Sequence, residues 1–214
     1  MSPVKPTRPE AAAISSLGVT AGQRIGLLGG SFNPAHEGHL HISDLAHKKL
    51  KLDWVWWLVS PQNPLKPECG MAPLQERLSH AQQVARGHAI RVTDIEKTLE
   101  TRFTVDTLGA LKKCFPDVNF VWLMGADNLI QIDRWTRWQQ VFKTTPVAVF
   151  ARPDYSNDAE NAKASRHFAN FRLDSDRAED LAEISPPAWV FLKTPENSVS
   201  ATEIRNRSQR PDAD

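Results

Sequence analysis

The chain has 214 residues, the size of one ordinary domain with a full hydrophobic core. Its 26 lysines and arginines nearly balance 25 aspartates and glutamates, so the composition excludes a broad basic face for nucleic acid or an anionic membrane. Two widely spaced cysteines and no signal-peptide pattern favour a reducing compartment, and the longest apolar run, Trp54 to Val59, is too short to cross a membrane. We therefore expect a soluble cytoplasmic protein that binds any polyanion locally.

The pattern of apolar runs predicts a single α/β domain. Residues 1–22 carry three prolines and an alanine-rich patch, and we expect a mobile extension there, followed by the domain at 23–208 and a tail at 209–214. About six strands alternate with helices, which predicts a Rossmann-like, doubly wound parallel sheet with right-handed crossovers. The strands are expected at residues 24–28, 54–59, 90–93, 119–125, 147–150 and 189–192.

The first strand leads into a turn and a helix that suit an anion. Gly29 and Gly30 close the strand and lack the Cβ atoms that would hold a ligand away from the backbone. Asn33 and Pro34 mark a turn, and helical spacing resumes at about Gly38. The first turn of such a helix points unpaired N–H groups toward the glycines, and its macrodipole attracts negative charge. The segment therefore predicts a phosphate-binding corner.

Two histidines make this corner more specific than a generic strand-turn-helix unit. His36 and His39 fall on one face at the mouth of the helix and can both donate to one phosphate chain, while Gly38 leaves room for a base or sugar. Zinc is disfavoured, because His36, His39 and His41 do not follow the H-E-x-x-H pattern. The glycine spacing fits neither the dinucleotide nor the P-loop fingerprint. Ordinary surface histidines remain the alternative at this point.

The second strand ends in a proline-rich loop, at the edge of the sheet where α/β proteins place ligands. Lys66 projects from this loop as a candidate phosphate contact, with a solvated surface lysine as the alternative. The tryptophans within Trp54 to Val59 suit a core and an interface equally well.

Helical spacing predicts three further segments. One helix is outlined from Pro73 to Gly87, with Glu76 and Arg77 on a solvated face. Another is predicted to begin at Thr104 as its N-cap. Residues 154–183 are rich in charge with weak apolar periodicity, and a helix with flexible flanks is expected there.

Two residues after the fourth strand are candidate ligand contacts. Asp127 follows Gly125 at the strand's end and is either a helix cap or a ligand to ribose or magnesium. Trp135 stands among polar neighbours, where an indole often stacks on a planar ligand, although a core tryptophan is the alternative.

A second phosphate-binding corner is predicted near the carboxyl end. Ser200 and Glu203 have the spacing of a capping box, which predicts a helix with hydroxyls and free N–H groups at its mouth. Arg205 lies just inside this helix, and its planar guanidinium suits phosphate oxygens. A purely structural capping box is the alternative.

These two corners together resemble the HxGH nucleotidyltransferase superfamily. The first signature, GG-x-F-(N/D)-P-x-H-x-G-H, is met from Gly29 to His39, and the second, I-S-S-T-x-I-R, is met from Val199 to Arg205 with two conservative departures. Segments between them resemble the bacterial nicotinate mononucleotide adenylyltransferases. The residues that carry this closer resemblance are the Pro61 to Lys66 loop, Glu76 to Leu78, Thr101 to Leu108, Gly125 to Asp127, Trp135, and Arg152 to Pro153.

The resemblance implies transfer of AMP from ATP to nicotinate mononucleotide, with Mg²⁺ held by substrate phosphates and water rather than by a protein metal site. It implies catalytic roles for His36, His39, Lys66 and Arg205. The residues implied to contact ATP are Gly29, Gly30, Ser31, Phe32, Gly38, Ser200, Thr202 and Ile204, and those implied to contact the mononucleotide are Asn33, Thr104, Gly125, Asp127, Trp135 and Arg152.

Other readings of the same signatures stay open. A pantetheine-phosphate adenylyltransferase or a cytidylyltransferase shares the first signature but does not need Trp135 or the segment Thr101 to Leu108. A nucleotide sensor without catalysis is a different class, although both signatures keep their polar residues. The sequence leaves open how strictly the acid is preferred to the amide, the oligomeric state, where a homo-oligomer is one option, and the conformation of Pro61 to Met71.

Overall fold

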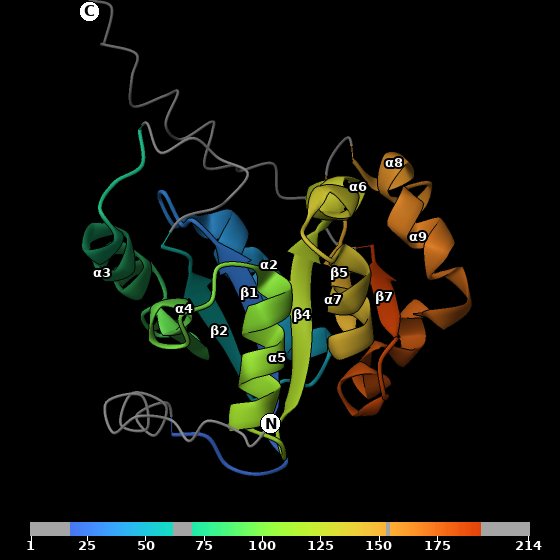
Figure 1. Cartoon of the computed structure of the whole chain (residues 1–214), viewed down its shortest axis with the longest axis horizontal. Coiled ribbons are helices and arrows are strands. Elements are labelled where there is room, and N and C mark those ends of the chain that lie inside the picture. Colours follow the sequence, from blue (N-terminus) through green and yellow to red (C-terminus); the bar gives the residue numbers. More distant parts are fainter. Residues whose placement is uncertain (1–17, 62–69, 153–154, 194–214) are drawn as a thin grey trace, which may run out of the picture.

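The computed structural model describes residues 18–61, 70–152 and 155–193, which form an α/β domain built on one parallel sheet (Figure 1). The sheet has seven strands in the order β3-β2-β1-β4-β5-β7-β6, and every neighbouring pair is parallel. The strands are β1 (Arg24–Gly30), β2 (Trp54–Val59), β3 (Ile90–Thr93), β4 (Asn119–Gly125), β5 (Val147–Phe150), β6 (Arg172–Leu173) and β7 (Trp189–Leu192).

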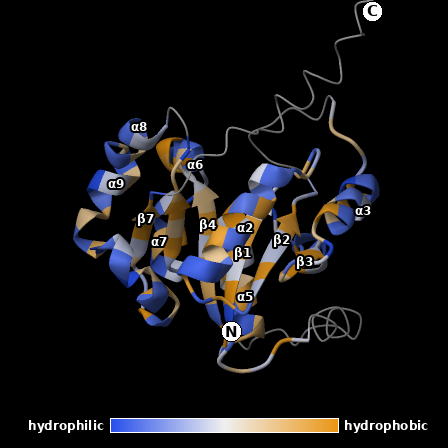
Figure 2. Ribbon diagram, turned by 180° about the vertical axis from the view of Figure 1, so that it is seen from behind, coloured by the Kyte–Doolittle hydropathy of each residue, from blue (hydrophilic) through white to orange (hydrophobic). Residues whose placement is uncertain are grey.

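Helices cover both faces of this sheet. The α-helices are α2 (Glu37–Lys49), α3 (Leu74–Val84), α4 (Ile95–Thr98), α5 (Thr104–Cys114), α6 (Ala126–Gln131), α7 (Trp138–Thr144), α8 (Ser156–Glu160) and α9 (Lys163–His167). The described residues also form three 3₁₀ segments, η1 (Ile132–Arg134), η2 (Ala169–Phe171) and η3 (Ser175–Glu183). Figure 2 shows the opposite side, where hydrophobic colouring follows the strands and α8 and α9 are largely hydrophilic.

Two hydrophobic clusters, one on each face, hold the layers together. Trp56 packs with α5, α6 and α7 on one face, and Trp57 packs with α2, α3 and η3 on the other. Both indoles are fully buried. Burial on both faces explains why the strands read as continuous apolar runs instead of alternating ones, and it assigns these two tryptophans to the core rather than to an interface.

The chain order of the strands creates the place for a site. From β1 the chain moves outward through β2 to β3 and then returns to β4 on the other side of β1, so the order reverses between β1 and β4. At such a reversal the loops that follow neighbouring strands diverge and leave a crevice at the carboxyl ends. The predicted Rossmann-like, doubly wound fold is confirmed, with one strand more than expected.

Three expectations about local structure need correction. The extra strand, β6, has only two residues and gives no apolar run to find. The single helix expected at 154–183 is instead α8, α9, η2, β6 and η3 within the described part of that range. Thr104 is the first residue of α5, whose N-cap is Phe103 without a side-chain cap bond.

Residues 18–22, within the expected amino-terminal extension, contact the domain. The Gly22 N–H donates to the Asp117 carbonyl at 2.7 Å, and Val19 packs against the core. These contacts join residues 18–22 to the domain.

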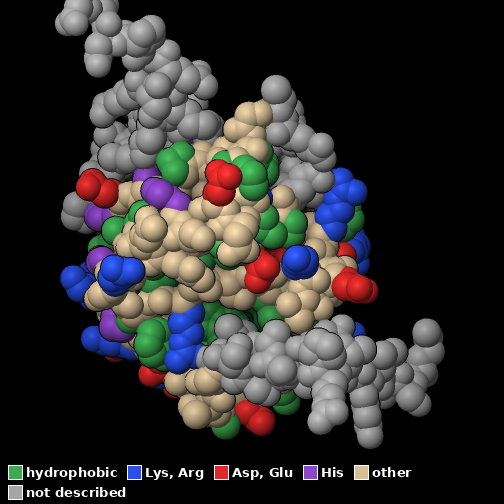
Figure 3. Space-filling model, turned by 90° about the vertical axis from the view of Figure 1, so that its left-hand side faces the viewer, with side chains coloured by type: hydrophobic (Ala, Val, Ile, Leu, Met, Phe, Trp, Pro, Cys, Tyr) green, Lys and Arg blue, Asp and Glu red, His purple; other side chains and the backbone are tan. Residues whose placement is uncertain are grey.

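Among the described residues no helix is long and apolar enough to cross a bilayer. On the face shown in Figure 3, acidic and basic side chains are interspersed.

Candidate active site

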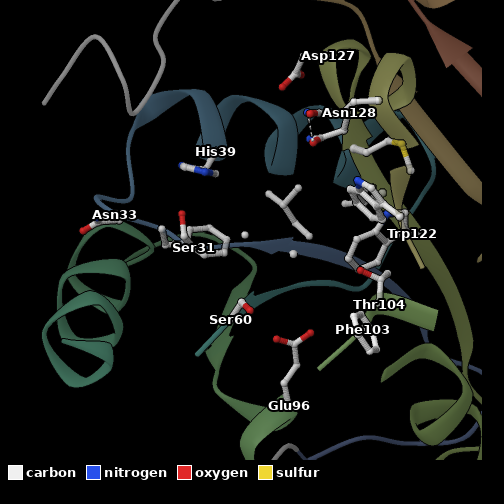
Figure 4. A pocket seen from close by; sticks show the side chains of 18 of the residues that line it. Ser31, Asn33, His39, Ser60, Glu96, Phe103, Thr104, Trp122, Asp127 and Asn128 are labelled. Carbon is white, nitrogen blue, oxygen red and sulfur yellow. Dashed lines mark hydrogen bonds between the residues drawn. The ribbon is translucent and has the colours of Figure 1, made fainter. Parts of the chain in front are cut away.

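A cleft of about 370 Å³ lies at the carboxyl ends of β1, β2 and β4, at the reversal of strand order. In Figure 4, His39 and Ser31 lie on one side, Trp122, Thr104 and Phe103 on the other, and Glu96 below them. Of the sequence-predicted residues, the cleft brings together Gly29, Gly30, Ser31, Phe32, Asn33, His36, His39, Thr104, Asp127, Trp135 and Arg152.

The predicted residues outside this lining fall into two groups. Gly38 and Gly125 are described but lie just behind the cleft surface, next to His36 and Asp127. Lys66, Ser200, Thr202, Ile204 and Arg205 lie outside the described residues.

The histidine turn is built around an unusual helix cap. His36 is the N-cap of α2, and its ring Nδ1 accepts the Gly38 N–H at 3.1 Å. Three residues later, the His39 Nδ1 accepts the His36 N–H at 3.2 Å. Side chains at N-cap and N3 thus satisfy two helix N–H groups reciprocally, the arrangement that serine and glutamate usually supply.

This reciprocal cap fixes the protonation state of both rings. A ring nitrogen that accepts a backbone N–H carries a lone pair, so neither Nδ1 of His36 nor Nδ1 of His39 is protonated. In each ring the proton is therefore on Nε2, which makes that atom a donor. The ring centroids lie 3.9 Å apart, so the cap holds two neutral imidazole donors side by side.

Aromatic packing sets the orientation of His39. Its ring lies 4.6 Å from the Phe32 ring and 5.8 Å from the Trp57 ring, measured between centroids. Phe32 is 1% exposed and adopts a φ of 47°, a left-handed conformation that the turn imposes on a bulky residue. The Ser43 hydroxyl accepts from Trp57 and donates to the His39 carbonyl, both at 2.8 Å. The imidazole thus rests on a rigid base.

His36 is buried, and its titration is displaced accordingly. Burial, followed by the positive charge of Arg152, lowers the pKa of His36 from 6.5 to about 4. Its side chain is only 6% exposed, and protonation at Nδ1 would remove the acceptor that caps α2. The folded protein therefore keeps this ring neutral through the physiological range.

A pH dependence of stability follows from that displacement. Because the pKa of His36 is lower in the folded state, the unfolded chain binds the extra proton first as pH falls. His36 then reduces the free energy of unfolding from pH 6.5 downward, by about 3 kcal/mol at pH 4, and has no such effect above pH 6.5. We expect His36→Asn, whose amide oxygen can still cap α2, to weaken this acid sensitivity.

Chemical denaturation of wild type and His36→Asn between pH 7 and pH 4 measures the difference. The exposed His80 on α3 provides the matched control, and His80→Asn is expected to follow the wild-type curve. Parallel curves for wild type and His36→Asn would contradict the assignment of the acid sensitivity to His36.

Two of the site glycines are required for packing reasons that the sequence did not reveal. A Cβ on Gly29 would lie 2.5 Å from the Trp122 ring, so the missing side chain makes room for a buried indole rather than only for a ligand. A Cβ on Gly30 would make ordinary contact with Phe32. At Gly125 a Cβ would lie 2.4 Å from the Asp127 Oδ1. Packing within the protein therefore accounts for two of the three.

The wall opposite the histidines carries Thr104 and Trp135. Trp135 meets Trp122 edge to face, with centroids 6.4 Å apart. An ion pair between Asp106 of α5 and Arg137, at 2.7 Å, joins the helix that Thr104 begins to the segment that bears Trp135. This ion pair therefore fixes the two predicted substrate contacts, Thr104 and Trp135, relative to each other.

Asp127 and Arg152 form an ion pair in the lining of the cleft. The guanidinium lies 3.4 Å from the Asp127 Oδ2, and both side chains are about a quarter exposed. The buried Oδ1 has no hydrogen-bond partner among the described residues. Asp127 makes no helix-cap bond, so the alternative of a simple cap is wrong.

Asn33 is tied to the segment on the far side of the proline-rich loop. Its side chain donates to the Gly70 carbonyl at 3.1 Å and accepts the Ala72 N–H at 3.2 Å. Both ends of the amide therefore bind backbone, which links the histidine turn to the residues that precede α3.

Sequence reasoning missed Ser60, Glu96 and Arg102 in the cleft, and it placed Arg77 wrongly on a solvated face. Arg77 is 3% exposed and donates to four backbone carbonyls, those of Ser31, Ser60, Pro61 and Ala72. Helical spacing could have indicated this, because Arg77 lies three residues after Leu74 and four before Ala81, on the face of α3 that packs against the core.

Within residues 18–61, 70–152 and 155–193, no group of three or more histidine, cysteine, aspartate or glutamate side chains could hold a metal ion.

The sheet, the crevice at its reversal point and the glycine-histidine corner define an α/β protein of the nucleotide-binding class. Residues 27–207 match the model of the cytidylyltransferase-like family. The chain belongs to this family.

Curated relatives cover nearly the whole chain. The probable nicotinate-nucleotide adenylyltransferase of Parvibaculum lavamentivorans is 52% identical over 189 residues, covering 88% of this chain and 94% of that protein. Its counterpart in Gluconobacter oxydans is 50% identical over 192 residues, covering 89% and 98%.

A solved structure shares the fold. The nicotinic acid mononucleotide adenylyltransferase of Plasmodium falciparum, complexed with NaAD, superposes with a TM-score of 0.65 at 18% identity, covering 86% of this chain and 83% of that one. At this identity the likeness establishes the architecture.

Proposed function

We propose that the chain transfers the AMP moiety of ATP to nicotinate mononucleotide, giving nicotinate adenine dinucleotide and pyrophosphate in NAD biosynthesis. The observation that carries this proposal is a single cleft with neutral histidine donors on one side and Thr104 with Trp135 on the other. Relatives of about half-identical sequence carry the corresponding name. A cytoplasmic location fits a reaction between two soluble metabolites.

The chemistry needs no protein nucleophile. The second pKa of a phosphate monoester is near 6, so the mononucleotide phosphate is an anion at neutral pH. One of its oxygens attacks the α-phosphorus of ATP, the bond from that phosphorus to the bridging oxygen breaks, and pyrophosphate leaves with the electron pair. The protein then has to align two polyanions and stabilise the charge on the α-phosphate oxygens.

On the ATP side, His36 and His39 donate from Nε2, with His39 serving the α-phosphate in the transition state. Neutral donors suit this role because they do not require a proton from solvent. Gly29, Gly30, Ser31, Phe32 and Gly38 shape the surface beneath the nucleotide. Lys66, Ser200, Thr202, Ile204 and Arg205 are proposed to hold the β- and γ-phosphates and the departing pyrophosphate.

On the mononucleotide side, Trp135 stacks on the pyridine ring and Thr104 faces its carboxylate. Asp127, with an oxygen that lacks a partner among the described residues, is proposed to accept from a ribose hydroxyl. Arg152 offers positive charge to the substrate phosphate, and Asn33 and Gly125 support the turn and the strand end beside it.

Mg²⁺ is proposed to bind together with ATP, where it would neutralise part of the charge on the phosphates. Mg²⁺ keeps several waters and usually binds proteins through few carboxylates, so substrate oxygens supply most of its ligands.

Pyrophosphate release tests the proposal. ATP and CTP are each combined with nicotinate mononucleotide, nicotinamide mononucleotide and phosphopantetheine. The expected result is fastest release with ATP and nicotinate mononucleotide. Preference for phosphopantetheine or CTP would favour the other transferases, and calorimetric ATP binding without release for any acceptor would favour a sensor.

Replacing Trp135 with alanine is expected to raise KM for nicotinate mononucleotide about 10- to 100-fold. The estimate corresponds to the loss of one ring stacked on an aromatic side chain, about 1–3 kcal/mol. Steady-state kinetics with either substrate varied provide the measurement. Trp135→Phe keeps an aromatic face and should lose far less, while equal KM values in wild type and Trp135→Ala would remove the stacking role.

A further inference from the structure

Glu96 is a buried acid in the cleft that the proposed mechanism does not use. It lies in α4, directly after β3, and its side chain is among those that line the cleft floor (Figure 4). The residue is 9% exposed, and no ion pair joins it to a cation within the described part of the chain. Burial raises the pKa of its carboxyl, while hydrogen bonds from Ser60 and Thr107 oppose that shift.

The first of those bonds connects Glu96 to the ATP side. Ser60 follows β2, and its side chain donates to the Glu96 carboxylate. The backbone of Ser60 is itself fixed, because its N–H donates to the Gly30 carbonyl at 2.9 Å and its carbonyl accepts from Arg77 at 2.8 Å. Glu96 is therefore anchored to the corner formed by the ends of β1 and β2.

The second bond connects Glu96 to the opposite wall. Thr107 is fully buried in α5, and its hydroxyl lies 3.2 Å from the Glu96 Oε1 and 2.9 Å from the Thr101 hydroxyl. A hydroxyl has one proton, so Thr107 donates to the carboxylate and accepts from Thr101. The Thr101 N–H also donates to the Glu96 carbonyl at 2.9 Å.

The turn held in this way leads straight to the substrate wall. Arg102, Phe103 and Thr104 follow Thr101 and all line the cleft. A carboxylate that accepts from both sides thus sets the distance between the glycine corner and Thr104. Because hydrogen bonds to a charged acceptor are the stronger kind, an acid holds this span more firmly than a neutral side chain can.

We propose that Glu96 is a positioning residue that joins Ser60 to the Thr101–Thr104 turn and so shapes the half of the cleft that receives the mononucleotide. The assignment rests on the proposed function, since it concerns the acceptor substrate of that reaction. It predicts that loss of the span weakens binding of the mononucleotide more than binding of ATP, whose proposed contacts among the described residues lie on α2 and the glycine corner.

Steady-state kinetics on the full chain, with ATP and nicotinate mononucleotide varied in turn, test the proposal. Glu96→Ala is expected to raise KM for the mononucleotide about tenfold, the factor equal to one lost bond to a charged group, with KM for ATP changed less than about twofold. Thr107→Val, which keeps the shape but removes the hydroxyl, should give the same selective rise. Glu179→Gln, at an exposed acid of η3, should match wild type.

Glu96→Gln tests whether the hydrogen bonds of Glu96 or its negative charge matters. The glutamine amide can still bond both hydroxyls after they rotate, so we expect KM for the mononucleotide to return most of the way to the wild-type value. A Glu96→Gln enzyme as impaired as Glu96→Ala, with Thr107→Val unaffected, would overturn the proposal by pointing to charge alone. Equal rises in both KM values for Thr107→Val would also overturn it. A wild-type protein that is inactive with this acceptor would instead refute the proposed function.

Discussion

Replacing His39 with alanine is expected to lower kcat for adenylyl transfer about 10²- to 10³-fold while the protein stays folded. The Nε2 proton of His39 is fixed by the bond from the His36 N–H to Nδ1, and the ring is seated on Phe32. A donor held in this way loses little entropy when charge develops on the α-phosphate, so its removal affects the transition state more than ground-state binding. Rapid-quench or steady-state assays with saturating substrates measure kcat directly.

Two controls separate catalysis from helix capping. His39→Asn can still accept the His36 N–H, so it should keep the stability of α2 and yet remain impaired, because its amide cannot place a donor at the Nε2 position. His47→Ala changes a histidine in the last turn of the same helix and should leave kcat unchanged. Near wild-type turnover in His39→Ala would remove His39 from the mechanism.

The fold could be predicted from sequence where burial is continuous. Strands such as Trp54–Val59 and Asn119–Gly125 are buried on both faces, so their continuous apolar runs predict them. The strand Arg172–Leu173 could not be predicted in this way, because two residues are too few to show a hydrophobic pattern. One of them is also charged, and the strand lies at the edge of the sheet.

The same distinction applies to the site. His36 and His39 belong to one local turn, so their spacing along the chain already indicated their shared face. The bond between Glu96 and Ser60 joins residues that only the sheet brings together, since β2 and β3 are neighbours. Thr104 was mistaken for a cap because its type suits that position, whereas Phe103 occupies it.

Replacing Arg77 with methionine is expected to lower the free energy of unfolding by about 3 kcal/mol, because the buried carbonyl of Ser31 and the partly buried carbonyls of Ser60 and Pro61 would lose a charged donor. Burial lowers the pKa of Arg77, but a guanidinium stays charged in proteins. Methionine preserves the apolar stem, so packing changes little. For a chain of this size the melting temperature should fall by roughly 6–12 °C, measured by calorimetry.

Arg77 also predicts a functional effect, because the carbonyls it binds belong to the loops after β1 and β2. Loosening them displaces Ser31 beneath the proposed ATP phosphates, so KM for ATP should rise in Arg77→Met even at temperatures where the protein is fully folded. Arg77→Lys keeps the charge but reaches fewer of the four carbonyls, which predicts intermediate stability. The exposed Arg86 supplies the matched control, and Arg86→Met should melt like wild type. A melting temperature for Arg77→Met equal to that of Arg86→Met would mean that water satisfies these carbonyls as well as the guanidinium does.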